Sequence, residues 1–217
     1  MFNTLGHIEL IKGNVIAAIE QFEQAYKVSP TAQNAIVLSE AYGKNKQLES
    51  TIKMLTEYMA NKPDHYKVEA TLANAYMVNE NDQMAELHYM NLFKQQSNDI
   101  VTLNNLAVIK MKLGKVDSAL GYAKKAIAEQ PNNAAVIDTY GMALYAKGKY
   151  KEALTYFDKA LSAHPKHIGF SINKSKVMIK MGERLKAKQI LQKLKTTDSD
   201  ALQNIHYLLE GIDNDSV

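Results

Sequence analysis

The chain has 217 residues, of which 46% are hydrophobic and 23% charged, a globular composition that excludes a disordered chain. Its 26 Lys and Arg against 23 Asp and Glu leave a net charge of +3, which by itself does not call for a polyanionic partner. The absence of cysteine excludes disulfides, thiolate metal sites and cysteine nucleophiles. No apolar run is long enough for a membrane span, and the first four residues lack the features of a signal peptide.

A period of 34 residues runs through the chain and is clearest in its second half. Three residue types return at this interval: Gly114, Gly148 and Gly182; Ala119, Ala153 and Ala187; Pro131 and Pro165. Extended backwards from Pro131, the frame reaches Ser97, Pro63 and, with one residue lost, Pro30. A period of this length indicates stacked supersecondary units. The predicted units are residues 1–31, 32–65, 66–99, 100–133, 134–167 and 168–199.

Each unit is predicted to hold two helices, because its apolar residues follow helical spacing twice with a break between. The first unit starts inside a helix, with Phe2, Leu5 and Gly6 in the positions of the first-helix pattern. The second unit is weaker but closes at Pro63, and the third has a polar turn at residues 79–82 instead of a glycine. The N-terminal end lacks a cap, so we expect either a longer array upstream or a dimer partner over this edge.

The fourth and fifth units carry the clearest pattern. The fifth contains Ile137, Tyr140, Gly141 and Leu144, then Ala153, Phe157, Ala160 and Pro165. Small residues such as Gly141, Ala107 and Ala73 are expected to let paired helices approach closely, while aromatic rings fill the remaining gap. The sixth unit departs from the pattern at Lys174, which leaves the register of residues 168–180 open. Its packing is assigned to Phe170, Ile172, Val177 and Met178.

A final helix is predicted after the sixth unit. Polar residues 196–200, which are rich in helix N-cap types, precede Leu202, Ile205, Leu209 and Ile212 at helical spacing. A repeat array leaves an apolar face open at its end, so we expect a capping helix at 200–212 to cover it. Residues 213–217 are predicted to be a frayed tail.

This layout resembles the tetratricopeptide repeat (TPR) family, whose units are helical pairs of the same length with small and aromatic residues at these offsets. The resemblance covers about nine tenths of the chain. It implies an all-α, right-handed α-solenoid of about six helix–turn–helix units plus the C-terminal capping helix. It also implies that the first helices line a concave surface that binds another protein.

The resemblance places inward-facing residues of the first helices 34 positions apart. Met77, Met111, Tyr145 and Ile179 would form a ladder of soft apolar groups suited to an extended peptide or a helix. Asn74 and Asn104 would hydrogen-bond the peptide backbone. Alternatively, Met77, Met111 and Tyr145 pack between neighbouring first helices. The predicted groove-binding residues are Asn74, Met77, Asn104, Val108, Met111, Asp138, Met142, Tyr145, Lys176 and Ile179.

Charge is distributed unevenly, with −4 over residues 1–99 and +7 over residues 100–217. One interpretation is a docking patch for an acidic partner, a phosphate-rich surface or nucleic acid. The other is a solvated face whose lysines keep the end of the array monomeric. Nucleic acid is disfavoured because no aromatic residue interleaves the lysines. The predicted basic patch consists of Lys174, Lys176, Lys180, Arg184, Lys186 and Lys188.

The sequence contains no glycine-rich phosphate loop, His-Glu-x-x-His motif or calcium loop. Ser50 with Lys53, and Ser171 with Lys174, have the spacing of a serine–lysine nucleophile, but both pairs lie in predicted helices without a companion motif. His164 and His167 could hold a surface zinc ion, although no third ligand is near in sequence. We therefore expect no catalytic residue, metal site or cofactor.

Residues 103–194 also resemble the last repeats of bacterial TPR lipoproteins of PEP-CTERM and exopolysaccharide systems. The most telling match is the step Asp138-Thr139-x-Gly141, while Met142 and Asn173 stand where that group usually has Trp and His. This narrower resemblance implies an upstream signal with a lipid-anchored cysteine and a place in the cell envelope or periplasm. Without it, the cytoplasm is the default expectation.

The sequence thus predicts a non-catalytic interaction scaffold that holds a peptide or partner helix in the concave groove, within a bacterial envelope export or exopolysaccharide system if the narrower resemblance holds. The alternative is an adaptor that binds an acidic or phosphate-rich partner through its basic C-terminal repeat. The expected partner is a protein or peptide. Self-association is expected only as a dimer through the uncapped N-terminal end.

Overall fold

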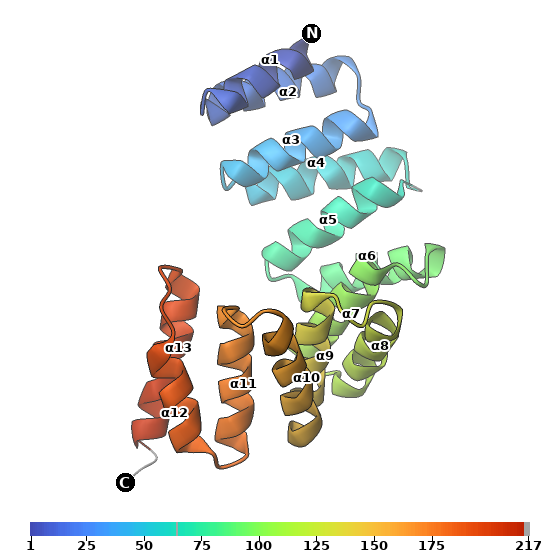
Figure 1. The fold of residues 1–217 in the computed structure, drawn as a ribbon. Helices are drawn as coiled ribbons and strands as arrows, with labels where there is room; N and C mark the ends of the chain where they lie inside the picture. The colour runs from blue at the N-terminus through green and yellow to red at the C-terminus, as the bar shows by residue number, and fades with distance from the viewer. Residues whose placement is uncertain (64, 215–217) are drawn as a thin grey trace. The chain divides into compact units, whose positions relative to one another are not determined.

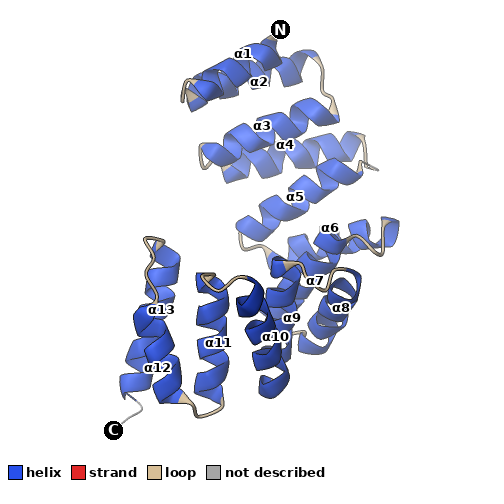
Figure 2. Cartoon of the chain, in the orientation of Figure 1, coloured by secondary structure: helices blue, strands red, loops and turns tan. Residues whose placement is uncertain are grey.

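The computed structural model describes residues 1–63 and 65–214, and every regular element in that part of the chain is a helix (Figure 2). This confirms the predicted all-α fold of paired helical repeats. The helices, labelled in Figure 1, are α1 (Phe2–Ile11), α2 (Val15–Val28), α3 (Ala32–Lys44), α4 (Leu48–Asn61), α5 (Tyr66–Val78), α6 (Asp82–Gln95), α7 (Ile100–Lys112), α8 (Val116–Glu129), α9 (Ala134–Ala146), α10 (Tyr150–Ala163), α11 (Ile168–Lys180), α12 (Arg184–Lys193) and α13 (Ser199–Asn214).

The chain divides into two compact units, Met1–Ser97 and Asn98–Val217. In the first unit, α1 packs on α2, α3 on α4 and α5 on α6, and the first helices α3 and α5 also touch. In the second unit, α7 packs on α8, α9 on α10 and α11 on α12, and α9 touches both α7 and α11. Consecutive helices therefore form antiparallel pairs that stack on their neighbours within each unit.

Five first helices begin with a side chain that caps the backbone, and these N-caps are spaced 34 residues apart. In each case the side chain accepts a hydrogen bond from the backbone N–H three residues later, which satisfies one of the free donors at the helix start. The acceptor is the Thr31 hydroxyl at 3.2 Å, His65 Nδ1 at 3.4 Å, the Asp99 carboxylate at 2.7 Å, the Asn133 amide oxygen at 3.3 Å and His167 Nδ1 at 3.2 Å. The 34-residue period of the sequence is thus also the spacing of the residues that cap these first helices.

The turn inside each pair also repeats, through one residue with a positive φ angle. Gly114, Gly148 and Gly182 hold this place in the second unit, with φ between 71° and 83°. In the first unit Lys46 and Glu80 adopt φ of 58° and 56° at the equivalent positions, where a side chain makes the left-handed conformation costly. The turn geometry therefore persists where the glycine is missing.

Helix α11 defines the register of residues 168–180 in the sixth unit. It runs from Ile168 to Lys180, and Phe170, Ile172, Val177 and Met178 are all buried, as predicted. Lys174 is half-buried and pairs with Asp158 of α10, with 2.7 Å between the ammonium nitrogen and the carboxylate oxygen. The departure from the repeat pattern is accommodated by this ion pair.

Helix α13 packs on both α11 and α12 (Figure 1). Ile205 and Ile212 are buried against a cluster that includes Ile172 and Leu191, whereas Leu202 of the predicted apolar stripe is 48% exposed. The helix extends beyond the predicted end, because Asp213 and Asn214 are helical rather than part of a tail. The rest of the predicted tail, residues 215–217, lies outside the described residues.

Helix α1 presents apolar side chains to solvent at the other end of the sequence. Leu5 is 39% exposed, Ile8 41% and Ile11 86%. The predicted dimer contact at this end stays a prediction. Among the helices of residues 1–63 and 65–214, none combines the length and apolar character that crossing a bilayer demands.

Candidate functional site

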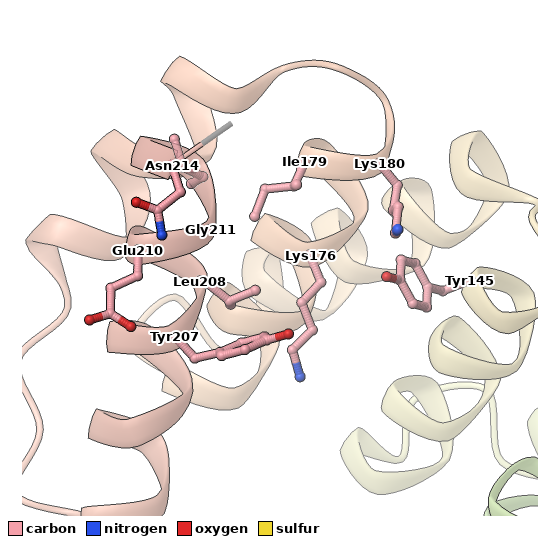
Figure 3. Close-up of a pocket in the computed structure, with 10 residues that line it drawn as sticks. Tyr145, Lys176, Ile179, Lys180, Tyr207, Leu208, Glu210, Gly211 and Asn214 are labelled. Atoms are coloured by element: carbon pink, nitrogen blue, oxygen red, sulfur yellow. The ribbon is translucent and has the colours of Figure 1, made fainter. Parts of the chain in front are cut away.

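A pocket of about 440 Å³ lies in the second unit between helices α9, α11 and α13 (Figure 3). Its lining residues are Tyr145 from α9; Lys176, Ile179 and Lys180 from α11; and Tyr207, Leu208, Glu210, Gly211, Ile212 and Asn214 from α13. Pockets of this size hold small ligands or a few residues of a peptide. The three predicted groove residues Tyr145, Lys176 and Ile179 thus lie around one hollow.

Helical spacing explains why α11 presents these side chains together. Ile172, Lys176, Ile179 and Lys180 follow one another at intervals that place them on one side of a helix. Ile172 is buried, Lys176 and Ile179 are half-buried, and Lys180 is exposed. The same side of α11 therefore changes from apolar packing to solvent along its length, and the pocket lies at the solvent end.

Lys176 lies near a half-buried acid, Asp138. Asp138 of α9 accepts a hydrogen bond from the Asn173 amide at 2.7 Å. Burial raises the pKa of Asp138, while the hydrogen bond from Asn173 and the nearby His167 and Lys176 act in the opposite direction. Burial also lowers the pKa of Lys176, and the carboxylate of Asp138 opposes that shift. Burial thus disfavours the charged form of each group, and the attraction between the two opposes that effect.

Half of the predicted basic patch is paired with nearby acids. Lys174 pairs with Asp158 at 2.7 Å, Lys186 with Glu183 at 2.9 Å, and Lys188 with Asp213 of α13. Arg184 is half-buried. By contrast, neither Lys176 nor Lys180 forms an ion pair with any residue that the structure describes, and both line the pocket. The available positive charge is therefore concentrated at this hollow.

The remaining predicted groove residues fall into two groups. In the first unit, Asn74 is exposed, but its side-chain oxygen already accepts a hydrogen bond from the buried Tyr89 hydroxyl. Met77, on the same helix, is half-buried. In the second unit Asn104, Val108 and Met142 are half-buried, and the Asn104 side-chain oxygen has no hydrogen-bond partner among the described residues.

Part of the predicted apolar ladder packs inside the protein. Met111 lies against the buried Ala107, Ala123 and Ala143, which belong to α7, α8 and α9. Its side chain therefore fills space between helices, as the alternative reading of the ladder expected. Tyr145 instead makes a tilted ring contact with Tyr150, at 5.6 Å between centroids, and lines the pocket.

His167 and Ser171, two of the residues that suggested chemistry, have structural roles. His167 caps α11, and the Ser171 hydroxyl donates a hydrogen bond to the His167 carbonyl oxygen at 3.2 Å. Lys174 is engaged by Asp158 rather than by Ser171. No group of three or more potential metal ligands occurs within residues 1–63 and 65–214.

Sequence reasoning missed the contribution of α13, which was expected only to cap the array. Tyr207, Leu208 and Glu210 of this helix line the pocket opposite α11. A signal was present, because Tyr207 and Leu208 are large apolar side chains beside the stripe of Ile205, Leu209 and Ile212. A cap needs only one apolar stripe, so additional apolar groups beside it indicate a second contact surface.

Three segments of the chain match family models described as tetratricopeptide repeats: residues 1–31, 104–168 and 144–211. Together these segments span more than half of the chain, and the helical pairs described above have the same period. The chain is a tetratricopeptide repeat protein. Proteins of this family are typically non-catalytic scaffolds for protein–protein interaction, and no catalytic family matches the chain.

Solved structures of other TPR proteins have the same fold. A tetratricopeptide repeat protein from Parabacteroides merdae aligns with a TM-score of 0.86 and 14% identity, over 99% of this chain and 85% of that one. MamA aligns with a TM-score of 0.65 and 20% identity over 76% of this chain and 91% of that one. MamA from Desulfovibrio magneticus aligns with a TM-score of 0.67 and 15% identity over 75% of this chain and 92% of that one. At these identities the likeness shows the fold alone. No curated protein matches the sequence.

Proposed function

We propose that this TPR protein is a non-catalytic scaffold that binds a peptide segment or partner helix along the first helices of its repeats. The observation that carries the proposal is the pocket in which Tyr145, Lys176 and Ile179, three predicted groove residues, surround one hollow. Half-buried apolar and aromatic side chains with a few polar groups are what a peptide-binding surface needs.

The proposal is tested with a random peptide library displayed on phage and selected against the full chain. Selected peptides should bind the unaltered protein and lose affinity for Tyr145→Ala, because this change removes an aromatic contact from the pocket. Leu185→Ala is the matched control, since Leu185 is 77% exposed on α12 and does not line the pocket. Failure to select any peptide would contradict the proposal, as would equal losses in both variants.

The alternative function, an adaptor for an acidic or phosphate-rich partner, receives support from only part of the predicted basic patch. Lys174, Lys186 and Lys188 are held by acidic side chains, so they offer little net charge to a partner. Lys176 and Lys180 remain available, and both belong to the pocket. This observation favours an acidic partner that enters the same hollow over one that covers a broad basic face.

Membership of a bacterial export or exopolysaccharide system stays a proposal from the narrower sequence resemblance. The matching family models and the similar structures named above include no lipoprotein of that kind. Peptide binding does not depend on it.

A further inference from the structure

We infer that the pocket between α9, α11 and α13 recognises an acidic peptide, holding a carboxylate against Lys176 and Lys180 and a neighbouring apolar side chain between Tyr145 and Tyr207. In this assignment α13 is one wall of the binding site rather than only a cap. The inference rests on the proposed function, because it names the partner chemistry of the same surface.

The charged residues that line the pocket are Lys176, Lys180 and Glu210. Asp138, the acid beside Lys176, is already engaged by the Asn173 amide at 2.7 Å. Glu210, the acid on the α13 side, lies 3.0 Å from His206 Nε2, and Figure 3 shows its carboxylate directed away from the two lysines. Asp213 is occupied by Lys188. Lys176 and Lys180 form no ion pair among the described residues, although Asp138 attracts Lys176.

Lys176, unlike Lys180, is half-buried. A partly desolvated ammonium group gains more from an opposite charge than an exposed one, since water screens it less. Lys180 is exposed at the mouth, where it can meet the same anionic group. In Figure 3 both side chains extend from α11, that of Lys180 beside Tyr145 and that of Lys176 between Tyr145 and Tyr207.

The rest of the lining is apolar and aromatic. Ile179 and Leu208 are half-buried, and Tyr207 is 74% exposed although it is a large aromatic residue. Tyr207 and Tyr145 come from different helices and lie on opposite sides of Lys176 in Figure 3. Exposed aromatic rings beside a charge are typical of surfaces that take up a side chain together with a polar group. The ligand should therefore carry an aliphatic or aromatic residue next to its acidic one.

The same lining argues against nucleic acid and free phosphate. A groove that follows a nucleic acid backbone needs an extended row of available cations with stacking rings between them. Here Lys174, Lys186 and Lys188 are paired with acids, which interrupts the row of cations along this part of the chain. Phosphate groups favour bidentate arginine, and the pocket contains no arginine among its described lining residues.

The test uses the full chain and fluorescent peptides with a glycine–serine background around one central pair of residues. Peptides with Asp or Glu followed by Leu or Phe should bind, and the Asn or Gln counterparts should bind about tenfold more weakly or worse, because a charge-assisted contact is lost. Affinity should fall as salt is raised. A phosphoserine version that binds more tightly than both acids, and does not respond to Tyr207→Ala, would overturn the assignment.

Variants separate the pocket from the rest of the surface. Lys180→Met should weaken acidic peptides about tenfold, while Lys186→Met, the matched loss of one exposed lysine, should change affinity less than twofold. Tyr207→Ala should weaken binding, and Leu202→Ala on the same helix should not, because Leu202 does not line the pocket. Lys176→Met is a second test of the charge and should also weaken acidic peptides. Its circular dichroism and melting temperature must match those of the unaltered protein, which shows that the variant is folded. Equal effects of Lys180→Met and Lys186→Met would overturn the inference.

The two proposals fail differently. If library-selected peptides bind but ignore Lys180→Met and Tyr207→Ala, the acidic-peptide pocket is wrong and the scaffold function stands. If neither the library nor the acidic peptides yield a ligand, both are wrong.

Discussion

The ring of Phe157 occupies the space in which Gly141 would carry a side chain: a Cβ atom at Gly141 would lie 2.7 Å from Cζ of Phe157. Gly6 and Phe22 repeat the relationship in the first unit, where the corresponding distance to Cε1 is 2.5 Å. Both phenylalanines are fully buried. The first and second helices of these pairs are thus set together by a missing side chain on one and a large ring on the other.

We therefore expect Gly141→Ala to destabilise the protein by about 1–3 kcal/mol, because the added methyl group must displace a buried ring. The control is Gly121→Ala in α8, where an added Cβ meets nothing within 4 Å. Alanine at that exposed helical position should be neutral or stabilise by up to about 1 kcal/mol. Urea denaturation of both variants measures the two effects, and equal stabilities would contradict the close approach of α9 and α10.

The same contact can be tested from the second helix. Ala153 of α10 is fully buried, so Ala153→Leu should overpack the pair and cost about 1–3 kcal/mol, with a lower melting temperature. Ala163→Leu adds the same volume at the exposed end of α10 and should have little effect. An unchanged melting temperature in Ala153→Leu would count against the repeat frame itself.

Much of the fold could be predicted because residues within each 34-residue unit determine its helices and its turn. Gly114, Gly148 and Gly182 supply the positive φ angle that the turn needs, and they stand out in the sequence. Lys46 and Glu80 also adopt a positive φ angle, but neither residue type favours that conformation, so the sequence does not indicate it. His65 and His167 were also missed as N-caps, because histidine is not among the usual capping residues. For His167, its spacing from His164 suggested metal binding instead.

The candidate site was less predictable because it depends on which helix faces meet. Spacing placed Tyr145, Lys176 and Ile179 on the first helices, but not the contacts that α13 makes with them. Ion pairs such as Lys174 with Asp158 join residues of different helices, and helix packing decides which charges meet. A run of lysines in a sequence therefore overstates the charge available to a partner.

The N-cap series gives a prediction with a neighbouring control. Asn133 accepts hydrogen bonds from the backbone N–H groups of Ala135 and Val136 at the start of α9. Asn133→Ala leaves these donors without their partner and should destabilise the protein by about 0.5–2 kcal/mol. Asn132→Ala alters an exposed residue that makes no cap and should change stability by less than about 0.5 kcal/mol. Thermal unfolding of the two variants measures the two changes in stability. Similar destabilisation in both would show that the Asn133 cap makes no specific contribution.

Asp138 should make stability depend on pH in a defined direction. Burial raises its pKa in the folded state above the ordinary value of 3.8, so the folded protein binds this proton more tightly than the unfolded chain does. Asp138 therefore contributes stability below pH 3.8 that is lost as the pH rises through the folded-state pKa. Asp138→Asn keeps an oxygen that can accept the Asn173 hydrogen bond but removes the titration.

The stability of Asp138→Asn relative to the unaltered protein should consequently increase as the pH rises from about 4 toward neutrality, and then level off. Urea denaturation at several pH values measures this difference, and carbon-13 NMR of the Asp138 carboxyl group follows its ionisation directly. Glu129→Gln is the control, because it removes one negative charge from an exposed side chain. A relative stability that instead falls with pH would mean that Asn173 and Lys176 stabilise the carboxylate by more than burial disfavours it.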